Sequence, residues 1–167
     1  MYTSIEHFAQ DYQEEMTATQ RLLDRLTDAS LKQEVAPGYR TLGHLAWHIA
    51  CSGMMVAAAG VKFEHPDERG GVPSSAQAIA DAYRKAMPAL VEAVKSQWTD
   101  PDLGTVQNVF GQNWSNGTTL NKFIKHEVHH RGQLTILMRQ AGLEVSGIYG
   151  PAKQEWAMIG MEAPALG

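Results

Sequence analysis

Apolar residues recur at helical spacing over four long stretches of the chain. Residues 4–27, 41–59, 76–97 and 119–141 each place apolar side chains three and four positions apart. This is the pattern of an amphipathic helix with one face turned toward a core. Four such helices joined by long connecting loops predict an all-α fold, a four-helix bundle.

Local signals mark the ends of these helices. Thr3 and Glu6 have the spacing of a capping box at the start of the first helix. Gly60 and Gly142 are expected to end the second and the fourth. Pro88 lies inside the third, where it removes a backbone donor and is expected to kink the helix.

The segments outside the four helices are shorter and less regular. Residues 105–110 are compatible with a short strand, and residues 114–117 predict a turn. A tail over 146–151 leads into a short C-terminal helix at about 152–159. Without repeats or low-complexity segments, residues 1–167 are expected to form a single domain.

Two histidines lie on the apolar line of the fourth helix. His126 and His130 fall within about 40° of the line through Phe123, Leu134 and Leu137. Their i, i+4 spacing separates their Cβ atoms by about 5 to 6 Å, so both imidazoles can reach one cation. Because polar groups in a core need partners, two buried imidazoles at this spacing favour a metal site over simple hydrogen bonding.

The second helix carries another histidine pair on its apolar line. His44 and His48 are also four residues apart, and periodicity alone does not choose between them. Bundles build metal sites from side chains on facing helices. Two imidazoles from the fourth helix and one from the second would leave coordination positions open, which is typical of catalytic metal sites.

A zinc-protease motif competes with this interpretation. Residues His126–His130 match H-E-x-x-H, in which Glu127 would act as general base. The longer form of the motif fails because Gln133 stands where its glycine should be. Glu144 and Glu155 are the candidates for a downstream ligand, but the chain lacks the pattern of a substrate-binding sheet. The protease is therefore the less favoured alternative.

Several neighbours of the histidines have two interpretations. Glu127 lies about 60° from the His130 line, so we expect a solvated side chain or one beside a metal ligand first, and a general base second. His129 points about 100° away from His130 and is expected at the surface. Cys51 is close enough in sequence to approach the metal, but a small core residue is the expected role.

The three residues after His130 also bear on the site. Gly132 within a helix costs about 1 kcal/mol relative to alanine, which a close helix crossing or the approach of a substrate would explain. Arg131 and Gln133 flank the site, and each would either contact an anionic group of a substrate or face solvent.

Composition narrows the classes of function. A formal net charge of −4 argues against a dedicated nucleic-acid binder. The single cysteine excludes an internal disulfide and fits a reducing compartment. The N-terminus lacks the pattern of a secretory signal, and the most apolar stretch, 45–61, is too short to span a bilayer comfortably. We therefore expect a cytoplasmic protein without nucleic-acid or membrane partners.

Three motifs resemble the DinB/YfiT-like family of metal-dependent hydrolases. Residues Thr41–Ala50 look like its second-helix motif, and His126–Leu134 resembles its H-x-x-x-H-R-G-Q signature. Tyr149–Trp156 resembles its tail, so the likeness covers most of the chain in the family's order and spacing. The resemblance implies an up-up-down-down four-helix bundle, a homodimer, and a metal site whose ligands are His48, His126 and His130.

The resemblance leaves His44 outside the ligand trio, one turn before His48. We expect His44 to line the mouth of the pocket, or to position a substrate or a water on the metal. Some related family members transfer or use low-molecular-weight thiols, which suggests a thiol as one substrate of this protein.

The expected cofactor is a divalent metal ion. Imidazole ligands suit zinc first and nickel next, with iron and manganese as alternatives. Such an ion would lower the pKa of a bound water toward about 7, or would hold a thiol as thiolate. The expected function is thus a hydrolase or a low-molecular-weight-thiol transferase acting on a small molecule, with thiol activation slightly favoured by the lean pocket. The alternative is a non-catalytic metal-binding or stress-related interaction protein.

Overall fold

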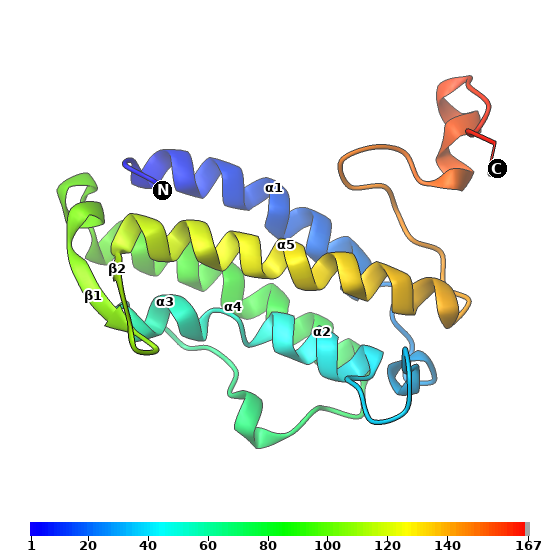
Figure 1. Cartoon of the computed structure of the whole chain (residues 1–167), viewed down its shortest axis with the longest axis horizontal. Helices are drawn as coiled ribbons and strands as arrows, with labels where there is room; N and C mark the ends of the chain where they lie inside the picture. The colour runs from blue at the N-terminus through cyan, green and yellow to red at the C-terminus, as the bar shows by residue number, and fades with distance from the viewer. Residues whose placement is uncertain (166–167) are drawn as a thin grey trace.

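The computed structural model describes residues 1–165 and is built mainly of helices (Figure 1). One small antiparallel hairpin lies between the last two long helices. The predominantly helical fold expected from the sequence is confirmed. The helices and strands are α1 (Ile5–Leu23), α2 (Leu42–Ala50), α3 (Met54–Ala58), α4 (Ala76–Gln97), β1 (Val106–Val109), β2 (Gln112–Ser115) and α5 (Asn116–Gln140). Short 3-10 turns are η1 (Ser30–Lys32), η2 (Glu68–Gly70), η3 (Asp100–Gly104) and η4 (Lys153–Ile159).

Helices α1, α2, α4 and α5 enclose the core. Both α1 and α2 pack against α4 and against α5, so each long helix has two long neighbours. Their apolar faces form one cluster, in which the aromatic residues and the larger aliphatic residues are almost fully buried. Its fully buried large apolar members include Phe8, Tyr12, Leu22, Leu42, Ile49, Ile79, Tyr83, Met87, Leu90 and Phe123.

The directions of α1, α2, α4 and α5 differ from the up-up-down-down order that the family resemblance implied. Ion pairs Glu6–Lys95 and Asp24–Arg84 join opposite ends of α1 and α4, which are therefore antiparallel. The Tyr2 N–H donates to the carbonyl of Gly117 at 3.1 Å, so α1 and α5 begin at the same end. In Figure 1, α1 and α5 run one way, whereas α2 and α4 run the other.

The expected up-up-down-down order was therefore wrong, and the order is up-down-down-up. The cause is the position of the long connection. Residues 59–75 return along the length of the molecule between α3 and α4, so that α4 repeats the direction of α2 (Figure 1).

The second predicted helix, 41–59, is broken into α2 and α3 by a turn at residues 51–53. A Cβ on Gly53 would lie 3.0 Å from the ring of Phe63 and 3.3 Å from Leu90. A residue with a side chain at this position would need Phe63 or Leu90 to shift by a few tenths of an ångström, so the close packing at the turn favours glycine.

The first helix, α1, also differs from prediction at both of its ends. Ser4, rather than the Thr3–Glu6 box, caps α1 by accepting a hydrogen bond from the His7 N–H. The predicted final turn, 24–27, is not helical, because Thr27 and Ser30 exchange side-chain and backbone hydrogen bonds that compete with the helix.

The hairpin confirms the short strand predicted near residues 105–110. Its tight turn has positive φ at Phe110 and Gly111, which matches the twist of the flanking strands. The predicted turn at 114–117 was wrong: β2 ends there and α5 begins, with Ser115 accepting the cap hydrogen bond from the Thr118 N–H. Within residues 1–165, no helix combines the length and the apolar run that crossing a bilayer requires.

Two glycines of α5 provide a matched test of this packing. A methyl group at Gly117 would overlap the carbonyl oxygen of Tyr2, whereas an added Cβ at Gly132 meets nothing within 4 Å. Of the two explanations given for Gly132, the close helix crossing is therefore excluded, and the approach of a substrate stays a prediction. We expect Gly117→Ala to lower the free energy of unfolding by about 1 to 3 kcal/mol through overpacking. Gly132→Ala should raise it by up to about 1 kcal/mol through helix propensity.

Urea denaturation of the two variants and the parent chain measures both effects. An unchanged or raised free energy of unfolding in Gly117→Ala would show that the start of α1 does not pack on Gly117 as described.

Candidate metal centre

Three histidines from two helices meet at one point. His126 Nε2 lies 3.2 Å from the Nε2 atom of His48 on α2, and 3.2 Å from that of His130, one turn along α5. One ring nitrogen from each histidine lies within 4.8 Å of the others. The structure thus brings together the three histidines for which the sequence predicted a shared cation.

The spacing of these nitrogens fits a bound metal ion. Zinc–imidazole bonds of about 2.0–2.1 Å place neighbouring ligand nitrogens about 3.3 Å apart in a tetrahedral site. The two observed nitrogen separations of 3.2 Å are close to that value. A common cation lets all three nitrogens contribute a lone pair at once, whereas a proton between two of them serves only that pair.

Two neighbours orient the rings. His48 Nδ1 lies 3.0 and 3.1 Å from the two carboxylate oxygens of Glu68, and His130 Nδ1 lies 2.8 Å from Gln133 Oε1. Both partners are acceptors, so we assign the proton of each ring to Nδ1. The Nε2 lone pairs of His48 and His130 then point into the cluster, as a metal site requires.

The sequence analysis missed Glu68. It lies in η2 within the long connection 59–75, where there is no helical periodicity to indicate a direction. Gln133 had a signal, because it lies three residues after His130 on the same helix and thus on the same side. The Nδ1 atom of His126 is buried and has no partner among the described residues.

The local environment keeps two of the rings neutral at physiological pH. Burial, followed by the nearby rings of His130 and His48, lowers the pKa of His126 to about 4. Burial also lowers the pKa of His130, against the opposing effect of the hydrogen bond that its ring donates to Gln133. Neutral imidazoles have the free electron pair that a metal ion needs, so these rings can bind without first losing a proton.

His44 does not join the cluster. It is exposed, and its Nδ1 lies 2.8 Å from the Thr41 hydroxyl at the start of α2. The expectation that it faces inward was wrong, because the buried face of α2 passes through Leu42, Leu45 and Ile49. His48 lies at the edge of that face, where it is half-buried.

Glu127 is fully buried, so the expectation of a solvated side chain was wrong. Its carboxylate accepts hydrogen bonds from the hydroxyls of Tyr12 (2.9 Å), Tyr83 (2.6 Å) and Thr19 (2.7 Å). These donors lie on α1 and α4, and they occupy both carboxylate oxygens. The arrangement argues against an H-E-x-x-H protease, whose glutamate must reach water at the metal.

Arg131 is buried as well, although it was expected to contact substrate or face solvent. Its guanidinium donates to the Glu15 carbonyl at 3.0 Å and forms an ion pair with the Glu15 carboxylate. It also donates to the Tyr149 hydroxyl at 2.6 Å, which attaches the tail to α1 and α5. The buried face of α5 thus passes through Glu127 and Arg131, and the preceding histidines stand at its edge.

The predictions for Cys51 and His129 agree with the structure. Cys51 is a buried, free core residue, as expected, and burial followed by the charge of Glu68 raises its thiol pKa to about 12. A thiol with so high a pKa is neutral at physiological pH, so it is not a reactive thiolate. His129 is exposed, as predicted.

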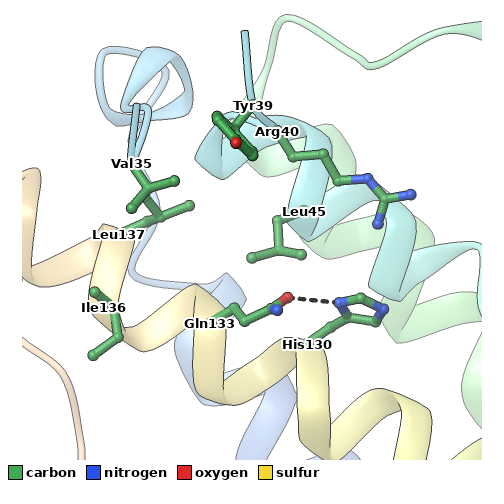
Figure 2. A pocket seen from close by; sticks show the side chains of 8 residues that line it. All are labelled: Val35, Tyr39, Arg40, Leu45, His130, Gln133, Ile136 and Leu137. Atoms are coloured by element: carbon green, nitrogen blue, oxygen red, sulfur yellow. Dashed lines mark hydrogen bonds between the residues drawn. The ribbon is translucent and has the colours of Figure 1, made fainter. Parts of the chain in front are cut away.

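Two cavities open beside the cluster. The larger, of about 450 Å³, reaches His130 and is lined by Val35, Tyr39, Arg40, Leu45, His130, Gln133, Ile136 and Leu137 (Figure 2). The smaller, of about 280 Å³, reaches the other two histidines and is lined by His48, Ser52, Met54, Met55, Phe110 and His126. Each of the three histidines therefore lines one of these two cavities.

A helical fold with three histidines that can share one cation defines a class of candidate metal-binding helical proteins. The chain matches the DinB family over residues 1–164 and belongs to that family. The resemblance noted in the motifs is thereby confirmed.

Three other proteins are similar to this chain in sequence or in fold. The protein YrdA of Bacillus subtilis strain 168 is 50% identical over 167 residues, covering 99% of this chain and 100% of the relative. A crystal structure of a DinB-like protein from Bacillus cereus ATCC 10987 has a TM-score of 0.86 at 50% identity, covering 89% of this chain and 100% of that one. The DinB-like protein YjoA of Bacillus subtilis shares the fold at 19% identity, with a TM-score of 0.67 and coverages of 87% and 98%.

The buried carboxyl of Glu127 predicts a pH dependence of stability. Burial raises its pKa above the ordinary 4.5, against the opposing hydrogen bonds and the charge of Arg131. A raised folded-state pKa contributes stability below pH 4.5 that is lost as the pH rises through the folded value. We expect the parent chain to lose stability relative to Glu127→Gln as the pH is raised from 4.5 to about 8.

Urea denaturation across this range measures the difference, and Glu14→Gln on the exposed face of α1 serves as control. If the parent instead gains free energy of unfolding relative to Glu127→Gln as the pH rises, the pKa of the Glu127 carboxyl is lowered in the folded state.

Proposed function

We propose that this protein is a metal-dependent enzyme that transfers a low-molecular-weight thiol to a small electrophilic molecule. The observation that carries the proposal is the convergence of three Nε2 atoms, from His48, His126 and His130. Three protein ligands leave coordination positions for a substrate, as in catalytic rather than structural metal sites.

The metal supplies Lewis acidity, which favours the thiolate form of a bound thiol near neutral pH. The chain's own residues prepare the site for it. Glu68 and Gln133 accept the Nδ1 protons of His48 and His130 and so hold these rings in one orientation. Imidazole donors suit zinc first, followed by nickel, with iron and manganese as alternatives.

Two features support thiol transfer over hydrolysis. The two cavities beside the cluster suit two separate substrates, whereas hydrolysis needs room for only one besides water. The carboxylate next to the ligands in sequence, Glu127, is turned into the core, where it cannot act as a base toward water at the cluster.

The reaction balances without a further reactant. The thiol loses its proton to solvent, and its sulfur forms a bond to the electrophilic carbon of the second substrate. The bond from that carbon to its leaving group breaks, and the leaving group departs with the electron pair.

The ligand set can be tested by metal content. His48→Ala, His126→Ala and His130→Ala should each weaken zinc binding by at least about 100-fold, since loss of a mere neighbour of a ligand weakens binding 10- to 100-fold. His44→Ala should bind zinc like the parent chain, because His44 lies outside the cluster.

Competition with a chromophoric chelator and elemental analysis after gel filtration measure both predictions. If His44→Ala empties the site while His48→Ala keeps its zinc, the ligand assignment is wrong and the two roles exchange.

The activity can be tested with cysteine or glutathione as thiol and monochlorobimane as a fluorogenic electrophile. Zinc-loaded protein should accelerate conjugation at least about tenfold over the uncatalysed rate, which corresponds to about 1.4 kcal/mol of barrier lowering. Chelation should abolish the acceleration, added zinc should restore it, and His126→Ala should lack it.

Other outcomes assign other functions. Metal-dependent hydrolysis of p-nitrophenyl acetate without thiol conjugation would identify a hydrolase. Tight zinc binding without either reaction, with cysteine and with glutathione as thiol, would identify a non-catalytic metal-binding protein.

A further inference from the structure

We propose that the cavity beside His130 binds a small apolar carboxylate and that Arg40 determines this specificity. The binding of the carboxylate is independent of the proposed reaction. Its role as the electrophile that receives the thiol rests on the proposed function. The cavity volume of about 450 Å³ lies within the range of small-molecule sites.

The cavity has two chemically different ends. Figure 2 shows Val35, Ile136 and Leu137 gathered at one end, with the guanidinium of Arg40 and the ring of His130 at the other. The apolar end suits a hydrocarbon chain or ring, and the polar end suits an acidic group. A molecule that matches both ends has one orientation in the cavity.

The positive charge of Arg40 has no acidic partner within the described chain. No carboxylate of residues 1–165 lies within 4.0 Å of its guanidinium, in contrast to Arg69, Arg84 and Arg131. Arg40 and His130 line the same cavity, and Figure 2 shows the guanidinium at the same end of it as the His130 ring. The guanidinium can therefore attract an anion bound at that end of the cavity.

The apolar walls are unusually open to water. Val35 is 58% exposed, Tyr39 69% and Ile136 53%, and all three line this one cavity. A bound apolar group would cover these side chains and gain about 25 cal/mol for each Å² of apolar surface removed from water. The geometry accordingly favours an amphipathic ligand over a fully polar one.

The position of Arg40 also limits where the ligand reacts. Because the His130 ring and the guanidinium lie at the same end of the cavity, we place the electrophilic carbon of the ligand close to its carboxylate. The thiol then approaches from the second cavity, which reaches His48 and His126. As in the proposed reaction, the sulfur–carbon bond forms while the bond from that carbon to its leaving group breaks. The leaving group is therefore attached to a carbon close to the carboxylate.

Octanoate is a suitable probe, because it has an apolar chain and one carboxylate. Isothermal titration calorimetry of the full chain, with and without zinc, should show binding in both forms. Arg40→Gln should weaken octanoate binding about tenfold through loss of a charge-assisted hydrogen bond. Arg139→Gln, which removes an exposed arginine outside the cavity, should not change it.

The neutral analogue octanamide separates charge recognition from loss of fold. It should bind the parent and Arg40→Gln with equal affinity, and more weakly to the parent than octanoate does. Equal octanoate affinities of parent and Arg40→Gln would overturn the role of Arg40.

A second pair of variants tests the apolar end. Ile136→Asp places a charge on the exposed wall of the cavity and should weaken octanoate binding at least tenfold. Ile159→Asp changes an isoleucine of similar exposure, 56%, in the tail and should leave the affinity unchanged. Identical effects of the two variants would show that octanoate does not occupy this cavity.

Failure of this inference is distinguishable from failure of the proposed function. Zinc-dependent thiol conjugation without octanoate binding up to about 10 mM, which is weaker than the millimolar affinity expected of a small ligand, would overturn the inference alone. The opposite result is Arg40-dependent octanoate binding in a protein that neither binds zinc nor conjugates thiols. That result would overturn the proposed function and the role of the ligand as electrophile, but it would leave the carboxylate site in place.

Discussion

One buried carboxylate sets the rotation of the longest helix. Glu127 on α5 receives hydroxyl donors from Tyr12 and Thr19 on α1 and from Tyr83 on α4, so that a single side chain joins three helices. A buried carboxyl group without these partners would be costly, and the partners are available only at one rotation of α5. The interaction therefore determines which residues of α5 face the core and which stand at its edge.

The metal centre follows from that rotation. His126 and His130 each precede a buried polar residue by one position, which turns them about 100° from it, toward α2. There they are half-buried and meet His48, which stands at the edge of its own helix in the same way. A position at the edge of the core combines partial desolvation with access from two cavities. Full burial would deny a substrate that access.

Polar contacts from irregular segments complete the arrangement. Glu68 reaches His48 from the long connection, and Arg131 holds Glu15 and the tail residue Tyr149 on the opposite side of α5. The two faces of α5 thus have different tasks. One carries a hydrogen-bonded buried network, which is typical of a structural role, whereas the other carries two imidazoles, His126 and His130, that meet His48 of α2.

The sequence by itself determined the helices and the spacing of the histidines along them. Helical periodicity predicted α4 correctly over 76–97, and the i, i+4 pair at His126 and His130 placed two ring nitrogens within reach of one cation. These features depend on neighbours along the chain, so they can be read from one segment at a time. The family resemblance added His48, which periodicity could not distinguish from His44.

Only the tertiary structure decided how each helix is rotated and what reaches the site from loops. An apolar arc is about 100° wide or more, and polar residues with buried partners can lie at its centre without any apolar signal. Glu127 and Arg131 occupy the centre of the α5 arc for this reason, and their partners lie on other segments. Glu68 likewise meets His48 through a connection without periodicity, because its position depends on how the long connection folds back across α2.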